Sequence, residues 1–215
     1  MLPLPSWNPE LTEETDDPFN LPLATIRHDA VLAALREVEA RTIIDLGCGS
    51  GALLQLLAAS PEFARLAGMD VSVAALARAA ARLGLDHSSG ERVTLFQGSL
   101  TYLDRRLHGY DAAVLTEVIE HLAPERLPAL ERVVFSSARP SAVIVTTPNA
   151  EFNVNYAGLR GFRNPDHRFE WGRGQFQAWA SGVAQRYGYA VTFRDVGFGN
   201  AAHGSPTQMG VFRGA

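Results

Sequence analysis

Short apolar runs alternate along the chain with longer segments in which apolar residues recur every three or four positions. A bounded run of roughly four to eight apolar residues is typical of a buried strand, and the longer periodicity is typical of an amphipathic helix. The short runs predict strands over 42–46, 64–71, 92–96, 111–115, 142–146, 190–196 and 208–212. The periodic segments predict helices over 24–39, 52–57, 72–83, 125–138 and 175–187.

Alternation of strands and helices predicts an α/β fold with helices on both faces of a largely parallel sheet. No helical segment separates the last two strands, so we expect an antiparallel strand at one edge. The sequence therefore predicts a doubly wound, Rossmann-like sheet of seven strands. Residues 149–173 have no periodicity and are rich in Asn, Gly, Arg and aromatic residues. Such a long irregular connection is often functional.

Composition favours one folded domain, because 47% of the 215 residues are hydrophobic and 20% are charged. Residues 1–22 are rich in proline and acidic residues, which predicts an extended arm before a domain over 23–215. No apolar run is long enough for a membrane span and no secretory signal is recognisable, so we expect no membrane association. A single cysteine, Cys48, excludes an internal disulfide and fits a cytoplasmic protein.

The net charge of −4 is unevenly distributed along the chain. Residues 1–150 contain 12 Arg and 19 acidic residues, whereas residues 151–215 contain 7 Arg and 4 acidic residues. The acidic balance argues against a nonspecific nucleic-acid coat, and we expect no DNA partner.

A glycine-rich loop follows the first strand and precedes a helix. Gly47, Gly49 and Gly51 would let the backbone approach a ligand at the helix amino end. Their register differs from the dinucleotide fingerprint, which weakens an interpretation as an NAD site. Asp70 ends the second strand, where its carboxylate could accept hydrogen bonds from an adenosine ribose. Asp45 precedes the glycines and suits a positively charged cofactor.

The segments Asp45-Leu46-Gly47-Cys48-Gly49-Ser50-Gly51 and Met69-Asp70-Val71-Ser72 resemble the class I S-adenosylmethionine-dependent methyltransferases. The resemblance implies S-adenosylmethionine as cofactor and this fold. Ser99, after the third strand, lies where that class usually contacts the adenine. The cofactor-binding residues expected on this basis are Asp45, Gly47, Gly49, Ser50, Gly51, Asp70, Val71, Ser72, Ser99 and Thr116.

Two carboxylates and an imidazole follow the strand over 111–115, at its carboxyl end. On a helix, Glu117, Glu120 and His121 would fall within an arc of about 100° and face one point. The alternative is a helix start, where acidic residues favour the positive end of the dipole. His167, in the irregular segment, is a plausible fourth ligand. Two carboxylates with two imidazoles favour Mn²⁺ over Mg²⁺ and over a tetrahedral Zn²⁺ site.

The residues Thr116-Glu117-Val118-Ile119-Glu120-His121, Thr147-Pro148-Asn149-Ala150-Glu151-Phe152-Asn153 and Asp166-His167-Arg168-Phe169-Glu170-Trp171 resemble the small-RNA 3′-terminal 2′-O-methyltransferase family. The tail Thr207-Gln208-Met209-Gly210-Val211-Phe212 is similar to that family's last strand as well. The resemblance covers roughly residues 25–213, in the family's own order.

This second resemblance implies divalent-metal-dependent methylation of the 3′-terminal ribose of RNA. The metal would chelate the terminal 2′- and 3′-hydroxyls. Glu117, Glu120, His121 and His167 would be the catalytic residues and the ligands of Mn²⁺, Mg²⁺ or a similar ion. The expected partners are an RNA 3′ end with both hydroxyls free and an RNA-repair or small-RNA-processing protein. Basic and aromatic residues of the irregular segment could hold phosphates and stack bases, namely Arg160, Arg163, Arg168, Arg173, Phe162, Phe169 and Trp171.

Two other functions stay open at this point. One is a small-molecule O-methyltransferase that acts on a metal-chelated catechol or similar diol. The two histidines and the Arg-rich segment count against it. The other is a methyltransferase-fold module without activity that binds RNA or a protein. The intact Asp70 and the complete ligand set count against that one.

Overall fold

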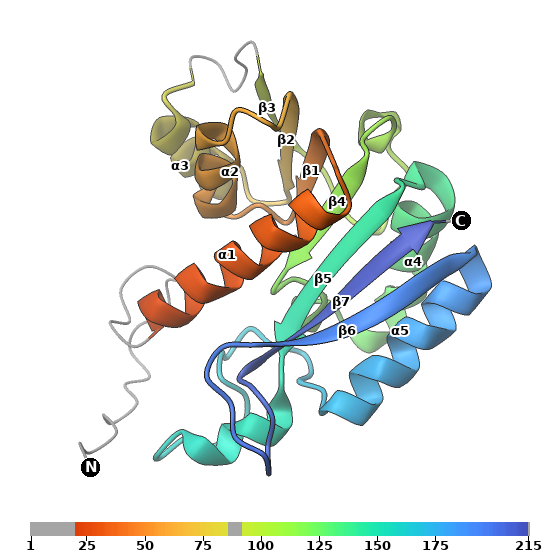
Figure 1. Ribbon diagram of the computed structural model, residues 1–215. Helices are drawn as coiled ribbons and strands as arrows, with labels where there is room; N and C mark the ends of the chain where they lie inside the picture. Colours follow the sequence, from red (N-terminus) through yellow and green to blue (C-terminus); the bar gives the residue numbers. More distant parts are fainter. Residues whose placement is uncertain (1–19, 86–91, 215) are drawn as a thin grey trace.

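The computed structural model of the protein describes residues 20–85 and 92–214 (Figure 1). The arm predicted over 1–22 lies largely outside the described residues. The helices are α1 (Asn20–Glu37), α2 (Ala52–Ala59), α3 (Val73–Leu83), α4 (Leu127–Glu131) and α5 (Arg173–Tyr187). The strands are β1 (Thr42–Leu46), β2 (Arg65–Asp70), β3 (Val93–Gln97), β4 (Ala112–Thr116), β5 (Ala142–Pro148), β6 (Tyr189–Val196) and β7 (Thr207–Gly214).

The seven strands form one sheet in the order β3-β2-β1-β4-β5-β7-β6 (Figure 1). The pairs among β1 to β5 are parallel, and β7 runs antiparallel to both of its neighbours, β5 and β6. The predicted fold, a mostly parallel seven-stranded sheet with an antiparallel pair at one edge, is confirmed.

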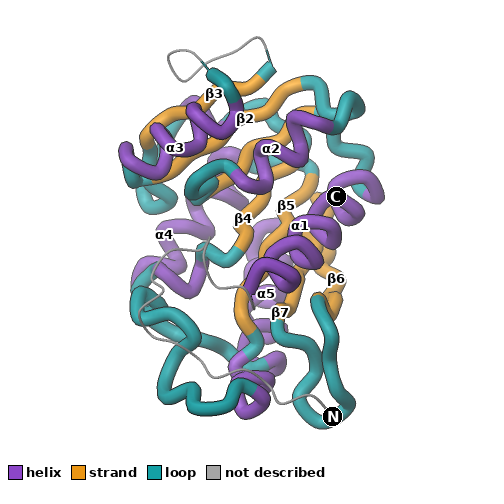
Figure 2. Tube along the Cα trace, turned by 90° about the vertical axis from the view of Figure 1, so that its left-hand side faces the viewer, coloured by secondary structure: helices purple, strands orange, loops and turns teal. Residues whose placement is uncertain are grey.

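The apolar core consists of two clusters, one on each face of the sheet, because successive side chains of a strand point to opposite faces. On β4, Val114 packs in the cluster that contains Leu35 of α1 and Leu54 of α2. The next residue, Leu115, packs in the cluster that contains Phe135 and, from α5, Phe176. Helices α1, α2 and α3 therefore cover one face (Figure 2), and α4 and α5 cover the other. Each strand therefore contributes alternate residues to the two helical layers that cover the sheet.

The helix predicted over 125–138 is divided into three short pieces. A 3₁₀ turn (Pro124–Arg126) precedes α4, and a π-helical segment (Arg132–Ala138) follows it. Pro128 has no backbone N–H and is tolerated only in a first helical turn, so a new helix begins just before it. None of the helices in residues 20–85 and 92–214 combines the length and apolarity that a bilayer crossing requires.

Strands β1 and β4 are adjacent, and the chain proceeds from them toward opposite edges of the sheet. This is the topological switch point of a doubly wound sheet, where a crevice opens at the carboxyl ends of the strands. The loops that follow β1, β2 and β4 meet at this place. The irregular segment after β5 starts at the same edge and contains a 3₁₀ helix, Ala150–Asn155.

Candidate active site at the carboxyl ends of the strands

A cavity of about 720 Å³ opens at the carboxyl ends of the central strands. Its wall contains eight of the predicted site residues: Gly47, Gly49, Ser50, Asp70, Val71, Ser99, Glu117 and His121. Arg78 and Arg82 of α3 and Asp166 of the irregular segment also line it. The predicted cofactor loop and part of the predicted metal site therefore border one continuous space.

The glycine loop touches the loop that follows β4. Gly47 has a φ of 82°, and a Cβ atom added there would lie 2.8 Å from Cγ2 of Val118. Gly51 has a φ of 78°, and a Cβ atom there would lie 2.9 Å from Cβ of Ala79 in α3. Both positions thus need glycine for conformation and for space. Gly47 brings the two loops together, whereas Gly51 lets α2 pack against α3.

The Asp70 carboxylate is held by the surrounding backbone. Its Oδ2 accepts a hydrogen bond from the N–H of Gly49 at 2.9 Å, and its Oδ1 accepts one from the N–H of Ser72 at 2.8 Å. The Ser72 hydroxyl in turn accepts from the N–H of Ala75 at 3.1 Å and caps α3. A carboxylate has about four acceptor positions, so Asp70 keeps capacity for hydroxyl groups in the cavity.

Four of the predicted cofactor residues lie outside the lining of this cavity: Asp45, Gly51, Ser72 and Thr116. Asp45 is 2% exposed within β1, and Thr116 is the last residue of β4. In sequence, Gly51, Ser72 and Thr116 directly adjoin lining residues, and Asp45 lies two residues before Gly47.

The prediction that Glu117 shares a helix face with Glu120 and His121 is wrong. Glu117 has a φ of 55°, and only Ile119–His121 form a single 3₁₀ turn. The N–H of Glu117 still donates to β5, to the carbonyl and the hydroxyl oxygen of Thr146 at 3.1 Å each. The chain leaves the sheet only after this residue, so Glu117 belongs to the strand end rather than to a helix.

Three of the four predicted metal ligands nevertheless come together. The potential ligand atoms of Glu120, His121 and His167 all lie within 4.8 Å of one another. The two imidazole rings have centroids 4.8 Å apart and are nearly perpendicular, at 81°. The N–H of Arg168 donates to the Glu120 carbonyl at 2.7 Å, which joins the irregular segment to the 3₁₀ turn. Tertiary contact therefore brings His167 into the site.

Glu117 lies beside this cluster and forms an ion pair with α1. Its Oε2 is 3.0 Å from Nη1 of Arg27, and the side chains of Arg27 and Glu117 are 15% and 11% exposed. Within the described part of the chain, the other carboxylate oxygen, Oε1, is buried without a hydrogen-bond partner, and so is Oε1 of Glu120. Two buried carboxylate oxygens at the site thus have no donor.

The electrostatics of the cluster favour a cation. Burial, and next to it the charge of Glu117, raises the pKa of Glu120 well above its usual range. Burial, and next to it the neighbouring His167, lowers the pKa of His121. Unpartnered carboxylate oxygens beside two imidazoles are a donor set that a divalent ion would satisfy. The mixture of oxygen and nitrogen donors fits a borderline ion such as Mn²⁺.

Three contacts to the predicted ligands were not foreseen. The hydroxyl of Thr147 donates to Oε2 of Glu120 at 3.0 Å, Nδ1 of His167 lies 2.6 Å from Oε1 of Glu170, and Arg27 pairs with Glu117. Thr147 and Glu170 belong to the motifs that carry the family resemblance, so their proximity to the site could have been inferred. No sequence signal identified Arg27.

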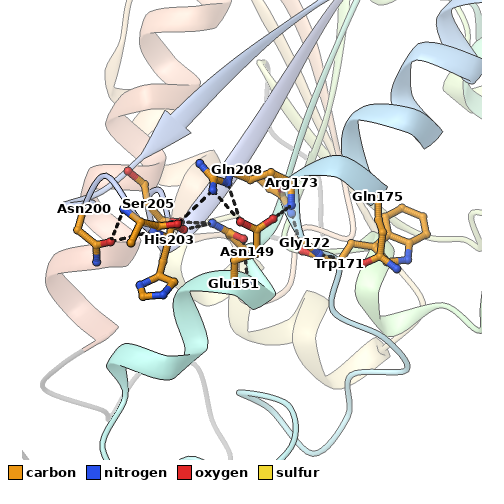
Figure 3. Close-up of polar contacts among 11 residues, drawn as sticks. Asn149, Glu151, Trp171, Gly172, Arg173, Gln175, Asn200, His203, Ser205 and Gln208 are labelled. Atoms are coloured by element: carbon orange, nitrogen blue, oxygen red, sulfur yellow. Dashed lines mark hydrogen bonds and ion pairs between the residues drawn. The ribbon is translucent and has the colours of Figure 1, made fainter.

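Several residues of the irregular segment that were expected to contact RNA make contacts within the protein instead. The guanidinium of Arg163 donates to the carbonyls of Asn149 and Pro206 at 2.6 and 2.7 Å. Arg173 pairs with Glu151 at 2.7 Å (Figure 3). Phe169 is 7% exposed and packs on Trp171, so it is not free to stack on a base. The exposed candidates are Arg160, Phe162 and Arg168.

Comparisons with known proteins find similar methyltransferases. A family model described as a methyltransferase domain matches residues 44–144. The small RNA 2′-O-methyltransferase of Gallus gallus is 39% identical over 204 residues, and the match covers 90% of this chain. The chain spans about half of that relative's length, 54%.

Two solved structures are also similar. The methyltransferase domain of bacterial CtHen1 is 50% identical with a TM-score of 0.82, and the match covers 90% of this chain and all of that one, 100%. The small RNA methyltransferase HEN1 is 38% identical with a TM-score of 0.83, and the match covers 94% of this chain and 27% of that one.

Proposed function

The chain belongs to the family of small RNA 2′-O-methyltransferases, and we propose that it methylates the 2′-hydroxyl of the 3′-terminal ribose of RNA. S-adenosylmethionine is the proposed methyl donor. The observation that carries this proposal is the continuous cavity, in which Asp70 and the glycine loop adjoin Glu117 and His121. A donor bound against the glycines would have its methyl group near an acceptor held at the cluster.

The cofactor half of the cavity fits an adenosine. We assign Asp70 to the two ribose hydroxyls, Ser99 to the adenine, and the backbone of Gly47 and Gly49 to the rest of the donor. Ser50 and Val71 complete this wall. The remaining predicted cofactor residues would act by shaping the loops: Asp45, Gly51, Ser72 and Thr116.

Glu120, His121 and His167 would hold a divalent ion, most suitably Mn²⁺. Glu117, whose carboxylate is paired with Arg27, would be the fourth ligand. Such an ion, when bound, lowers the pKa of the ribose 2′-hydroxyl and orients the 2′- and 3′-oxygens. The two unpartnered carboxylate oxygens support this assignment.

In the proposed reaction, the bond between the methyl carbon and the sulfonium sulfur breaks as a bond to the 2′-oxygen forms. S-adenosylhomocysteine and a 2′-methoxy ribose are the products, and the hydroxyl proton is lost to solvent. If the cavity holds both reactants in line, this positioning would supply much of the rate. Arg160 and Arg168, which are exposed, are the proposed contacts to RNA phosphates. A partner protein in RNA repair or small-RNA processing stays a prediction.

The test is transfer of a labelled methyl group to a short RNA, followed by digestion to nucleosides. We expect label on the 2′-oxygen of the last nucleoside and none on internal nucleosides. A catechol and a DNA oligonucleotide of the same sequence are the comparison substrates. Label on an internal nucleoside, or preference for the catechol, would contradict the proposal.

Replacing Asp70 with Ala should weaken S-adenosylmethionine binding by about 1.5–3 kcal/mol, because the change deletes charge-assisted hydrogen bonds to the ribose. Isothermal titration calorimetry measures the loss directly. Asp195→Ala is the matched control, because Asp195 is an exposed carboxylate on β6, at the far edge of the sheet. Unchanged affinity in a folded Asp70→Ala protein, or binding of NADH in place of S-adenosylmethionine, would refute the assignment.

A further inference from the structure

Glu170 is a buried carboxylate that lines no part of the cavity but contacts a proposed ligand. Its side chain is 1% exposed. Oε1 lies 2.6 Å from Nδ1 of His167 and accepts a second hydrogen bond from the N–H of Arg163 at 2.7 Å. Oε2 accepts from Nδ2 of Asn153 at 2.6 Å. All three partners come from the irregular segment that follows β5.

These contacts determine which nitrogen of His167 carries the proton. Both oxygens of Glu170 accept hydrogen bonds from N–H groups, Oε1 from the backbone of Arg163 and Oε2 from the side-chain amide of Asn153, which is the arrangement of an ionised carboxylate. An ionised carboxylate can only accept hydrogen bonds, so Nδ1 of His167 must donate. In a neutral imidazole the lone pair then lies on Nε2, which is the nitrogen left for the cluster with Glu120 and His121.

Asn153 and Arg163 hold Glu170 in one orientation. Nε of Arg163 donates to Oδ1 of Asn153 at 2.6 Å, so the amide of Asn153 must turn its Nδ2 toward Glu170. The same guanidinium donates to the carbonyls of Asn149 and Pro206 and lies over the ring of Tyr156, 5.0 Å from its centroid. A chain of polar contacts thus runs from the end of β5 to the imidazole of His167.

We propose that Glu170 is a positioning residue that fixes His167 in the tautomer able to bind a divalent ion through Nε2. The inference rests on the proposed ion site of the methyltransferase. It gives the irregular segment a specific role, which is to hold one proposed metal ligand, His167, in place through Glu170. Carboxylates that hold a ligating histidine in this way contribute to metal affinity and orient the ring.

The hydrogen-bond pattern predicts that even the conservative substitution Glu170→Gln disturbs the contacts around His167. In Glu170→Gln, one orientation of the new amide places its NH₂ group next to Nδ2 of Asn153, so that two donors face each other. The opposite orientation places the NH₂ group next to the backbone N–H of Arg163, which is also a donor. The second orientation also forces Nδ1 of His167 to accept, which moves the proton to Nε2. Adding Asn153→Asp removes the conflict, because the carboxylate introduced at position 153 accepts from both the amide at position 170 and the guanidinium of Arg163. The double variant keeps the net charge of this chain of contacts.

Mn²⁺ affinity tests the proposal without reference to activity. Titration of Mn²⁺ into the protein, followed by the loss of the free-ion signal in electron paramagnetic resonance, yields the dissociation constant. We expect Glu170→Gln to weaken binding by about 10- to 100-fold, at the usual scale for such outer contacts. Glu170→Gln with Asn153→Asp should recover most of the affinity. Glu151→Gln should change nothing, because Glu151 pairs with Arg173 in the same segment.

Wild-type affinity in Glu170→Gln, or a loss that the double variant does not recover, would overturn the proposal. A second measurement needs no variant. Two-dimensional ¹⁵N–¹H correlation of the imidazoles in the metal-free protein should find His167 protonated at Nδ1, and protonation at Nε2 would also overturn it. Failure of the wild-type protein to bind Mn²⁺ would overturn the ion-binding part of the inference and remove the ion from the proposed function. Methyl transfer to RNA would still be judged separately, by the labelling test.

Discussion

Treatment with EDTA should abolish methyl transfer, and added Mn²⁺ should restore it better than Mg²⁺. The reason is the donor set, in which two imidazoles accompany the carboxylates, whereas Mg²⁺ prefers oxygen ligands. Without an ion, the 2′-hydroxyl keeps its ordinary high pKa and is a poor nucleophile. Transfer of labelled methyl to RNA, measured across a series of divalent ions after chelation, checks the result.

The ligand assignment has its own control. Glu117→Gln keeps the size of the side chain but removes its charge, so it should lose methyl transfer while the fold and S-adenosylmethionine binding are retained. Glu151→Gln, which changes a carboxylate paired with Arg173, should leave transfer unchanged. Full activity in EDTA would exclude an ion from the mechanism, and full activity of Glu117→Gln would remove Glu117 from the ligand set.

An RNA that ends in a 3′-deoxynucleotide should be methylated about 10²-fold or more slowly than one with a free terminal diol. Such an end keeps the nucleophilic 2′-hydroxyl but loses one of the two oxygens that orient it, and misplacing a reacting group has a cost of this order. Single-turnover rates with saturating RNA separate this effect from weaker binding. A 3′-phosphate should also be a poor substrate, because it would crowd the cluster of Glu120, His121 and His167.

A 2′-deoxy end is the baseline for this series, because it has no nucleophile. If the 3′-deoxy RNA is methylated as fast as the diol, chelation by both oxygens is not how the terminal ribose is recognised. The proposal that Glu117, Glu120, His121 and His167 select a vicinal diol would then be wrong, even if methyl transfer itself is observed.

The sequence by itself determined the fold and the location of the site. Short apolar runs in β1, β4 and β5 are a local pattern that specifies a strand buried on both faces, and alternating helices restrict the topology to a few choices. A strand also determines the position of any motif that directly follows it in the sequence. Asp70 at the end of β2 and Glu117 after β4 were therefore located correctly at the carboxyl edge of the sheet.

Only the tertiary structure decided how the polar side chains of the site are paired. The local pattern suggested a helix at Glu117, but its N–H remains bonded to β5, and its carboxylate pairs with Arg27 from α1. Arg163 was expected to hold RNA phosphates, yet it holds Asn153 and, through it, Glu170. Hydrogen bonds and ion pairs of this kind join residues far apart in the chain. They follow from where the packed elements bring those residues and have no periodicity that a sequence could display.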